Sequence, residues 1–458
     1  MRVLLVSTYD MGRQPFGLAS PAAWLSEAGA DVRCLDLTRE KLQDDAFQAA
    51  DVVGFFLPMH TATRLALPVI DRVRAINPRA RVIAYGLYAP LNATLLRERG
   101  VTDVLGGEFE AELVERALSD DRSVGPQPRV AATVPRLQFK VPSREGLPPL
   151  TRYATLLLNG ERRTVGYTEA SRGCKHRCRH CPIVPVYRGA FRAIPVDVVL
   201  EDVRMQITAG AQHVSFGDPD FFNGPSHARR VVERLAAEHP GVGYDVTIKI
   251  EHLLKHADML PLLRDTGCLF VTSAVESIDP VVLHALRKGH TREDFVRAVE
   301  LCRAAGVRLS PTFVPFTPWT TAAGYVDLLD QLRALELEED VAPIQLGIRL
   351  LVTADSALLE LDEIRGGIAS FDPESLTYPW RHADASVDTL QMQVMHLVSA
   401  MREAPRHEIF DAIDAAARAA AHASPRAASP RAHVPAAPHM TEAWYCCAEP
   451  GPDIASYV

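Results

Sequence analysis

The first 120 residues alternate between short apolar runs and helical stretches. The apolar runs read RVLLVS, DVRCLDL, DVVGFFL, RVIAYG and VTDVLGG. Most are separated by segments with helical spacing of apolar positions, such as GLASPAAWLSEAGA. Five strands joined in this way predict a doubly wound parallel sheet, with any ligand at the carboxyl ends of the strands. Those ends carry Thr8, Tyr9, His60 and Tyr88.

A second series of strand-like runs starts near residue 166. The runs read GYTEASRG, HVSFGD, DVTIKI, CLFVTSAVE, RLSPTFVPF and PIQLGIRLL, again with helical stretches between them. Six βα units in succession predict a partial parallel barrel, with its site at the carboxyl ends of the strands. After residue 354 the pattern becomes helical, and SPRAASPRAHVPAAPHM then has the composition of a flexible linker.

The predicted fold class is therefore α/β. A doubly wound five-stranded parallel sheet is followed by a partial (β/α)6 barrel and a helical C-terminal region with a flexible tail. The predicted boundaries are 1–122 for the first domain, 123–160 for a linker, 161–353 for the barrel, 354–422 for the helical region and 423–458 for the tail.

Composition and charge narrow the function classes. Of the 458 residues, 47% are apolar and 23% charged, which is typical of a soluble globular protein. The net charge of −8 disfavours nucleic acid as a partner. No apolar run approaches the roughly 20 residues that span a bilayer, so no membrane partner is expected. The first apolar run is too short for a signal peptide, and we predict a cytoplasmic location with the eight cysteines reduced.

The strongest chemical signal is ASRGCKHRCRHCPIVPVYRG. Cys174, Cys178 and Cys181 have the spacing C-x3-C-x2-C directly after the first strand of the second series. Three thiolates on one loop suit three irons of a [4Fe–4S] cluster, which leaves the fourth iron open to another ligand. The alternative is a zinc site completed by His176 or His180, although no second C-x2-C or H-x3-H pair lies nearby.

This motif and its position make residues 160–352 resemble the radical S-adenosylmethionine (SAM) superfamily. In that family the open iron is chelated by the amino and carboxylate groups of SAM, and the reduced cluster cleaves the sulfonium to give a carbon radical. The resemblance also implies an electron donor of the flavodoxin or ferredoxin type. His180 matches the position that packs on the adenine.

The resemblance implies further SAM contacts. SFGDPDFFNG stands where the family often has Gly-Gly-Glu, so Gly217, Asp218 and Asp220 are candidates near the SAM amino group. SAVESIDPVVLHALRKGHT places Glu276 and Ser277 near the ribose. In LGIRLL, Arg349 is a candidate inward-facing contact. The alternative for Asp218, Asp220 and Arg349 is a capping or surface role.

TIKIEHLLKH, after the third strand of the barrel, carries four polar residues. These residues are Lys249, Glu251, His252 and Lys255. They suit a substrate site at the mouth of the barrel, and equally a helix that begins with an acidic first turn. Three other cysteines are expected in the core: Cys34, Cys268 and Cys302.

The N-terminal domain resembles the cobalamin-binding domain of one radical SAM subgroup. In the wider family a histidine in an Asp-x-His-x-x-Gly loop ligates cobalt. Here STYDMGRQPFG has Asp10 without that histidine, and His60 follows a different strand. Either cobalamin binds without a protein ligand to cobalt, or the domain has lost the cofactor. We favour loss or a purely structural role.

The chain ends in TEAWYCCAEPGPDIASYV, with Cys446 and Cys447 adjacent. Adjacent Cα atoms are ~3.8 Å apart, so a relaxed disulfide is disfavoured, but both thiolates can bind one soft atom. The alternatives are an incidental pair or a redox pair. The ending resembles a group of radical SAM proteins with a C-terminal Cys-Cys-Ala-Glu-Pro, in which one cysteine is sometimes selenocysteine.

These features lead to three hypotheses. The first is a radical SAM enzyme that transfers a SAM-derived carbon group, such as 3-amino-3-carboxypropyl, to arsenite or another metalloid held by Cys446 and Cys447 as catalytic residues. The second is a cobalamin-dependent radical SAM methyltransferase that acts on a small organic metabolite. The third is a non-catalytic redox or metal-sensing protein.

Overall fold

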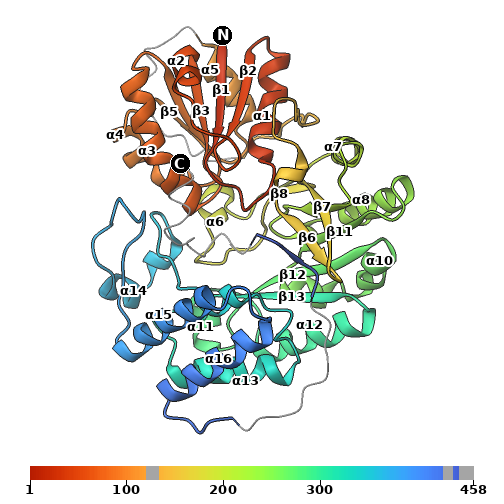
Figure 1. Cartoon of the computed structure of the whole chain (residues 1–458), viewed down its shortest axis with the longest axis vertical. Coiled ribbons are helices and arrows are strands. Elements are labelled where there is room, and N and C mark those ends of the chain that lie inside the picture. The colour runs from red at the N-terminus through yellow and green to blue at the C-terminus, as the bar shows by residue number, and fades with distance from the viewer. Residues whose placement is uncertain (120–133, 427–436, 443–458) are drawn as a thin grey trace.

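The N-terminal residues form a five-stranded sheet in which all neighbouring strands are parallel, in the order β2-β1-β3-β4-β5 (Figure 1). The computed structural model describes residues 1–119, 134–426 and 437–442. The strands are β1 (Arg2–Ser7), β2 (Asp31–Asp36), β3 (Val52–Phe56), β4 (Arg81–Tyr85) and β5 (Asp103–Leu105). The connecting helices are α1 (Phe16–Glu27), α2 (Asp44–Ala49), α3 (His60–Ile76), η1 (Pro90–Asn92), α4 (Ala93–Glu98) and α5 (Glu110–Leu118).

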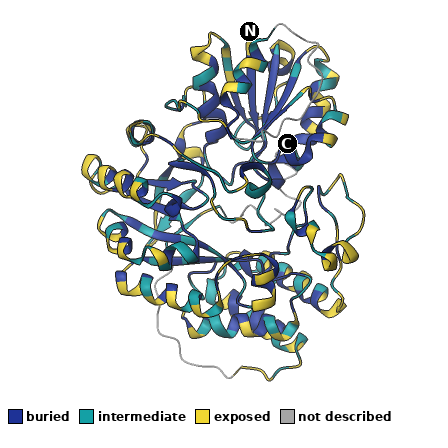
Figure 2. Ribbon diagram, turned by 180° about the vertical axis from the view of Figure 1, so that it is seen from behind, coloured by how far each residue is buried: buried dark blue, intermediate teal, exposed yellow. Residues whose placement is uncertain are grey.

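Two apolar cores lie on opposite faces of this sheet. One contains side chains of α2, α3 and α4, and the other contains side chains of α1 and α5. The sheet is therefore doubly wound, as predicted. Figure 2 shows its buried strands between helices whose outer faces are exposed.

A second sheet has seven strands in the order β13-β12-β11-β10-β7-β6-β14. The run from β7 to β13 is parallel, and β6 and β14 are added antiparallel at its edge. These strands are β6 (Thr155–Leu158), β7 (Glu161–Thr168), β10 (His213–Phe216), β11 (Gly243–Thr247), β12 (Cys268–Glu276), β13 (Arg308–Phe313) and β14 (His439–Met440). The short pair β8 (Ser171–Gly173) and β9 (Phe191–Ala193) stands beside the sheet.

Helices pack against this curved sheet and continue into the C-terminal region. Those of the barrel are α6 (Ile183–Tyr187), α7 (Val196–Thr208), η3 (Phe221–Asn223), α8 (Pro225–Glu238), α9 (Ile250–Lys255), η4 (Ala257–Met259), α10 (Leu260–Asp265), α11 (Pro280–Ala285), α12 (Arg292–Ala305) and α13 (Ala322–Ala334). The remaining ones are η2 (Leu150–Arg152) before the barrel and η5 (Pro343–Leu346), η6 (Ala357–Glu360), α14 (Asp362–Gly367), α15 (Ala385–Ala400) and α16 (Arg406–Ala420) after it. The predicted α/β fold, with a half-barrel and a helical C-terminal region, is confirmed.

The sixth predicted barrel strand, PIQLGIRLL, is reduced in the structure. Its first half forms η5, and its second half makes one isolated parallel bridge, between Phe316 and Arg349. Pro343 begins η5, and the side chain of Gln345 accepts a hydrogen bond from the Phe313 backbone N–H at 3.0 Å. A side chain therefore occupies a donor of β13 that a sixth strand would have used.

Strand β14 brings the end of the described chain back to the edge of the barrel. His439 and Met440 pair with Leu157 and Leu156 of β6. Two residues later, Glu442 accepts a hydrogen bond from the Tyr9 hydroxyl at 3.2 Å, directly after β1. Cys446 and Cys447 lie outside the described residues.

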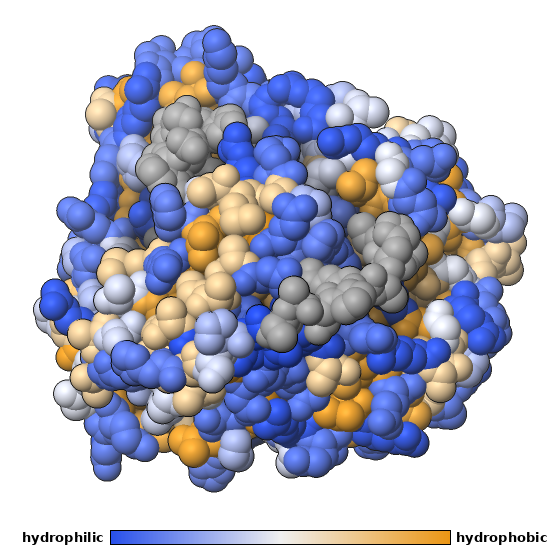
Figure 3. Space-filling model, turned by 60° about the horizontal axis from the view of Figure 1, so that its bottom comes forward, coloured by the Kyte–Doolittle hydropathy of each residue, from blue (hydrophilic) through white to orange (hydrophobic). Residues whose placement is uncertain are grey.

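Two further features of the structure concern membranes: the apolar character of its helices and the distribution of apolar residues on its surface. Among the described residues, no helix has the length and apolar character needed to cross a membrane. The face shown in Figure 3 mixes polar residues with smaller apolar areas.

Candidate active site

The three cysteines of the C-x3-C-x2-C motif lie on one loop between β8 and α6. Gly173, just before the first of them, has φ = +74°, and a Cβ there would lie 2.5 Å from the Ala190 carbonyl oxygen. Only glycine fits this approach. The Arg179 backbone N–H donates to the Leu286 carbonyl at 3.0 Å, which attaches the loop to the region after α11.

Burial favours the protonated form of two of the three thiols. Burial raises the pKa of Cys174, and burial together with the neighbouring thiols raises the pKa of Cys181 to about 12. Metal ligation must therefore displace protons from these two thiols. In the described part of the chain the three cysteines do not form a group with all ligand atoms within 4.8 Å of one another. Thiolates that share one zinc lie about 3.8 Å apart, given Zn–S bonds of about 2.3 Å. The wider spacing suits ligands of separate irons.

Glu276 connects this loop to the fourth parallel strand. It ends β12 at a β-bulge with φ = +67°, a conformation that is unfavourable for a residue with a side chain. Its Oε1 lies 3.1 Å from His180 Nε2 and 3.3 Å from Lys288 Nζ. Burial favours the neutral acid, but the Lys288 ammonium and His180 outweigh it and lower the pKa of Glu276 to about 2. The structure thus brings together two predicted SAM contacts and adds Lys288.

The predicted residues after β10 divide into two groups. A Cβ on Gly217 would lie 1.8 Å from the Tyr167 hydroxyl, so glycine is required there. Asp218 is buried and accepts hydrogen bonds from the Ala170 N–H and the Ser171 hydroxyl. Burial raises the pKa of Asp218 to about 7. Both oxygens of Asp218 thus brace the turn between β7 and β8.

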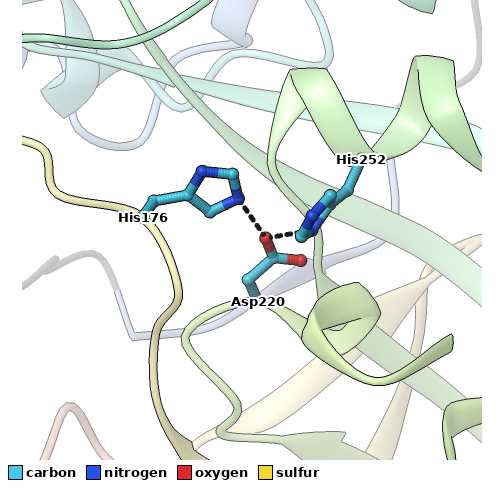
Figure 4. A group of neighbouring side chains, drawn as sticks. All are labelled: His176, Asp220 and His252. Atoms are coloured by element: carbon cyan, nitrogen blue, oxygen red, sulfur yellow. Dashed lines mark ion pairs between the residues drawn. The ribbon is translucent and has the colours of Figure 1, made fainter. Parts of the chain in front are cut away.

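Asp220 instead faces the cysteine loop (Figure 4). Its Oδ2 lies 3.3 Å from His176 Nε2, on that loop, and 2.6 Å from His252 Nδ1, on α9. Burial would raise the pKa of Asp220, but the two imidazoles lower it below its usual value. The polar residues around α9 extend this group, since Lys249 Nζ lies 3.2 Å from His176 Nδ1 and contacts Glu251. Lys255 is exposed and lies outside it.

Two predicted SAM contacts have other partners in the structure. The Ser277 hydroxyl accepts a hydrogen bond from the Asp279 backbone N–H at 3.1 Å. Arg349 forms an ion pair with Asp388 at 2.6 Å, and its guanidinium carbon lies 3.5 Å from the centre of the Trp380 ring. Arg349 therefore joins the barrel to the C-terminal helical region.

A buried ionic network precedes the cysteine loop and joins β8 to the start of α5 in the N-terminal domain. Arg172 lies 2.7 Å from Glu110, 3.3 Å from Glu108 and 2.7 Å from Glu169. The Tyr187 hydroxyl, at the end of α6, donates to Glu108 at 3.1 Å. Sequence patterns missed this network, because its members come from distant segments: Glu108 and Glu110 lie around the start of α5, Glu169 follows β7, and Arg172 is on β8. The acidic residues at the start of α5 were the only feature of the sequence that could have pointed to this network.

We expect Glu108→Gln to flatten the pH dependence of stability. Burial raises the pKa of Glu108 to about 7 against the attraction of Arg172, compared with an ordinary value of 4.5. A carboxyl with a higher pKa in the folded state contributes less to the free energy of unfolding as pH rises from about 4.5 to about 7. Glutamine does not titrate. Urea denaturation across this range should therefore show the wild type losing stability relative to the variant.

The matched control for this prediction is Glu300→Gln, on the exposed face of α12. It should leave the pH dependence unchanged. Parallel stability curves for the wild type and Glu108→Gln would contradict the assignment.

At the carboxyl edge of the N-terminal sheet, two of the residues predicted to line a ligand site contact backbone carbonyls of the protein instead. Thr8 donates to the Ala62 carbonyl at 2.7 Å, and His60 Nε2 lies 2.6 Å from the Ser375 carbonyl oxygen. Leu376 is buried in the same core as the strands. These contacts engage the only imidazole that the sequence places among the predicted strand-end residues. Because His60 Nε2 contacts the Ser375 carbonyl, cobalamin at the sheet edge would have to bind without a histidine ligand to cobalt from these strand ends.

Comparisons with known proteins agree with this geometry. Residues 168–332 match the family described as the radical SAM superfamily. The hopanoid C-3 methylase of Methylococcus capsulatus is 24% identical over 328 residues, which cover 67% of this chain and 62% of the methylase. The chain thus spans less than two thirds of that relative.

Two solved structures share the fold. Cobalamin-dependent SAM radical enzyme OxsB, with aqua-cobalamin and SAM bound, has a TM-score of 0.69 at 14% identity, over 92% of this chain and 71% of that one. The radical SAM methyltransferase TsrM from Kitasatospora setae, with cobalamin and a [4Fe–4S] cluster bound, has a TM-score of 0.55 at 19% identity, over 73% of this chain and 70% of that one. The radical SAM family implies a [4Fe–4S] cluster and SAM as cofactors, and the cysteine loop fits that cluster. Residues 168–332 thus match the radical SAM superfamily, and this match, together with the methyltransferase relatives, supports an enzyme.

Proposed function

We propose that this enzyme is a cobalamin-dependent radical SAM methyltransferase that acts on a small organic molecule. The observation that carries the proposal is the packing of α6. This helix follows Cys181 directly, and Val186 and Tyr187 pack with Leu87, in the loop after β4. Tyr187 also bonds to Glu108, after β5. The edge of the N-terminal sheet and the cysteine loop are therefore neighbours.

In this proposal each part of the chain has a separate task. The three cysteines hold the cluster, and bound cobalamin supplies a carrier for the methyl group. Charged Glu276, held by Lys288 and His180, presents an acceptor to the SAM ribose. The names of relatives support methyl transfer: a methylase of hopanoids and a methyltransferase, TsrM, whose structure holds cobalamin. They favour this hypothesis over transfer to arsenite.

The test uses the full chain, reconstituted with iron and sulfide under anaerobic conditions. Hydroxocobalamin is added, excess is removed, and the absorption spectrum of the protein is recorded. The protein is then reduced by a flavodoxin system and given SAM with a deuterated methyl group. We expect protein-bound cobalamin, with 5′-deoxyadenosine and S-adenosylhomocysteine as products. SAM cleavage by a chain that retains no cobalamin would overturn the proposal.

A second candidate function is supported by the position of Glu442. This residue bonds to Tyr9, and β14 holds the preceding residues on the barrel edge. Cys446 follows Glu442 by four residues, so chain length limits its distance from Glu442 to about 14 Å. The cysteine pair on this tether is the candidate holder of arsenite for transfer of a 3-amino-3-carboxypropyl group. Methylthioadenosine that forms only with arsenite, and not in Cys446→Ser/Cys447→Ser, would support it over methyl transfer.

A further inference from the structure

Three potential metal ligands converge beside the cysteine loop from three separate segments. His176 comes from that loop, Asp220 from the segment after β10, and His252 from α9 (Figure 4). Their ligand atoms all lie within 4.8 Å of one another. We propose that His176, Asp220 and His252 bind one divalent first-row transition-metal ion, separate from the cluster. The argument rests on these side chains and not on the proposed methyl transfer.

The first support is that the three atoms are buried without hydrogen bonds. Among the described residues, His176 Nε2, Asp220 Oδ2 and His252 Nδ1 each lack a hydrogen-bond partner. Asp220 is only 1% exposed. The imidazole nitrogens lie 3.3 and 2.6 Å from Oδ2 as ion-pair contacts and do not meet the geometry of a hydrogen bond. Such atoms are costly to bury unless another group satisfies them. A cation between them would accept all three lone pairs.

The second support is the spacing of the ligand atoms. Around a tetrahedral ion with bonds of about 2.0–2.1 Å, ligand atoms lie about 3.3 Å apart. The distance from His176 Nε2 to Asp220 Oδ2 is 3.3 Å. His252 Nδ1 is closer to that oxygen, at 2.6 Å, so its ring must move back when the ion binds.

The third support is the surroundings of His176. Its other ring nitrogen, Nδ1, lies 3.3 Å from the Glu251 carboxylate, which also contacts the Lys249 ammonium. Metal-bound histidines commonly donate their second N–H to a carboxylate, which orients the ring and leaves the opposite nitrogen to the metal. Glu251 is positioned to accept this N–H. The Lys249 ammonium, which can only donate, lies 3.2 Å from the same nitrogen and must release it when the metal binds.

The ligand set indicates the type of ion. Two imidazoles and one carboxylate suit Zn²⁺, Fe²⁺ or Co²⁺ better than Mg²⁺ or Ca²⁺, which favour oxygen ligands. Three protein ligands leave at least one coordination position for water or substrate. The ion, and not the SAM amino group expected from the family resemblance, would then be the partner of Asp220.

The test titrates Zn²⁺ into the cluster-loaded full chain in competition with a chromophoric chelator, without SAM. We expect one Zn²⁺ per chain with unchanged iron content. His252→Ala and Asp220→Asn should each weaken zinc binding more than about 100-fold, because even an outer partner of a metal ligand contributes 10–100-fold. His256→Ala is the matched control: its ring centre lies 5.8 Å from that of His252, outside the trio. It should bind zinc like the wild type.

Zinc-edge X-ray absorption separates this site from the cysteine loop. We expect only nitrogen and oxygen neighbours at about 2.0–2.1 Å, whereas zinc on the cysteines would show sulfur at about 2.3 Å. Failure of the wild type to bind zinc, sulfur neighbours, or wild-type affinity in His252→Ala would each overturn the proposal. Iron content and circular dichroism show whether the variants keep the cluster and the fold.

Discussion

A chain with Cys178→Ala is expected to lose its cluster iron and, with it, reductive cleavage of SAM. Cys178 is buried at the centre of the cysteine loop, and a lost ligand should cost more than the 10–100-fold typical of an outer-shell partner. Formation of 5′-deoxyadenosine should therefore fall more than about 100-fold. Iron content, the visible absorption of the cluster and chromatography of SAM products measure the effect.

Cys302→Ala is the control for this prediction. Cys302 is buried on α12 within the apolar core of the barrel, so the same substitution there removes only core packing. The control should keep its iron and its SAM cleavage. SAM cleavage at wild-type rate in Cys178→Ala would rule out this loop as the cluster site.

Arg172→Met should lower the free energy of unfolding by about 3–5 kcal/mol, the cost of removing one partner from a buried ionic group. The change leaves Glu108 and Glu110 without their cation, and both carboxylate side chains are 0% exposed. Methionine fills much of the same space between Phe16 and Phe109, which flank the guanidinium. The decrease in the free energy of unfolding therefore reflects the missing positive charge more than a change in side-chain volume. Urea denaturation of the full chain at neutral pH measures it.

Arg297→Met provides the comparison. Arg297 pairs with Glu300 on the surface of α12, where both side chains are more than half exposed, and such pairs contribute about 0–1 kcal/mol. Equal losses in the two variants would show that the Arg172 network has no special importance. Arg172→Lys, which keeps the charge but not the forked geometry, should fall between the wild type and Arg172→Met.

The sequence was most informative where local pattern determines structure. Alternating strands and helices predicted both sheets, because apolar periodicity and βα connection length are local properties. The cysteine spacing and the end of β12 singled out the cysteine loop and Glu276, and the structure brings His180 of that loop to 3.1 Å from Glu276; their roles as cluster and SAM ligands stay predictions. The interpretation of Arg349 as a SAM contact remains a prediction, and its contacts with Asp388 and Trp380 could not be inferred from LGIRLL.

Pairings between distant segments could not be predicted. Strand β14 is two residues long and pairs with β6, which precedes it by more than 280 residues. No local pattern marks so short a strand. The polar residues of TIKIEHLLKH left two interpretations open, because their meaning depends on where His176 and Asp220 lie in space. Lys288 was missed for the same reason, since its partner Glu276 is twelve residues away across α11.

Helix α6 has a thermodynamic consequence for the whole molecule. It continues the cysteine loop at one end and packs on the loops of the N-terminal sheet at Val186 and Tyr187. Coupling free energies are reciprocal. A compound that binds the sheet edge and, through α6, raises the affinity of the loop for its cluster by a given factor must itself bind more weakly by that factor when the cluster is lost.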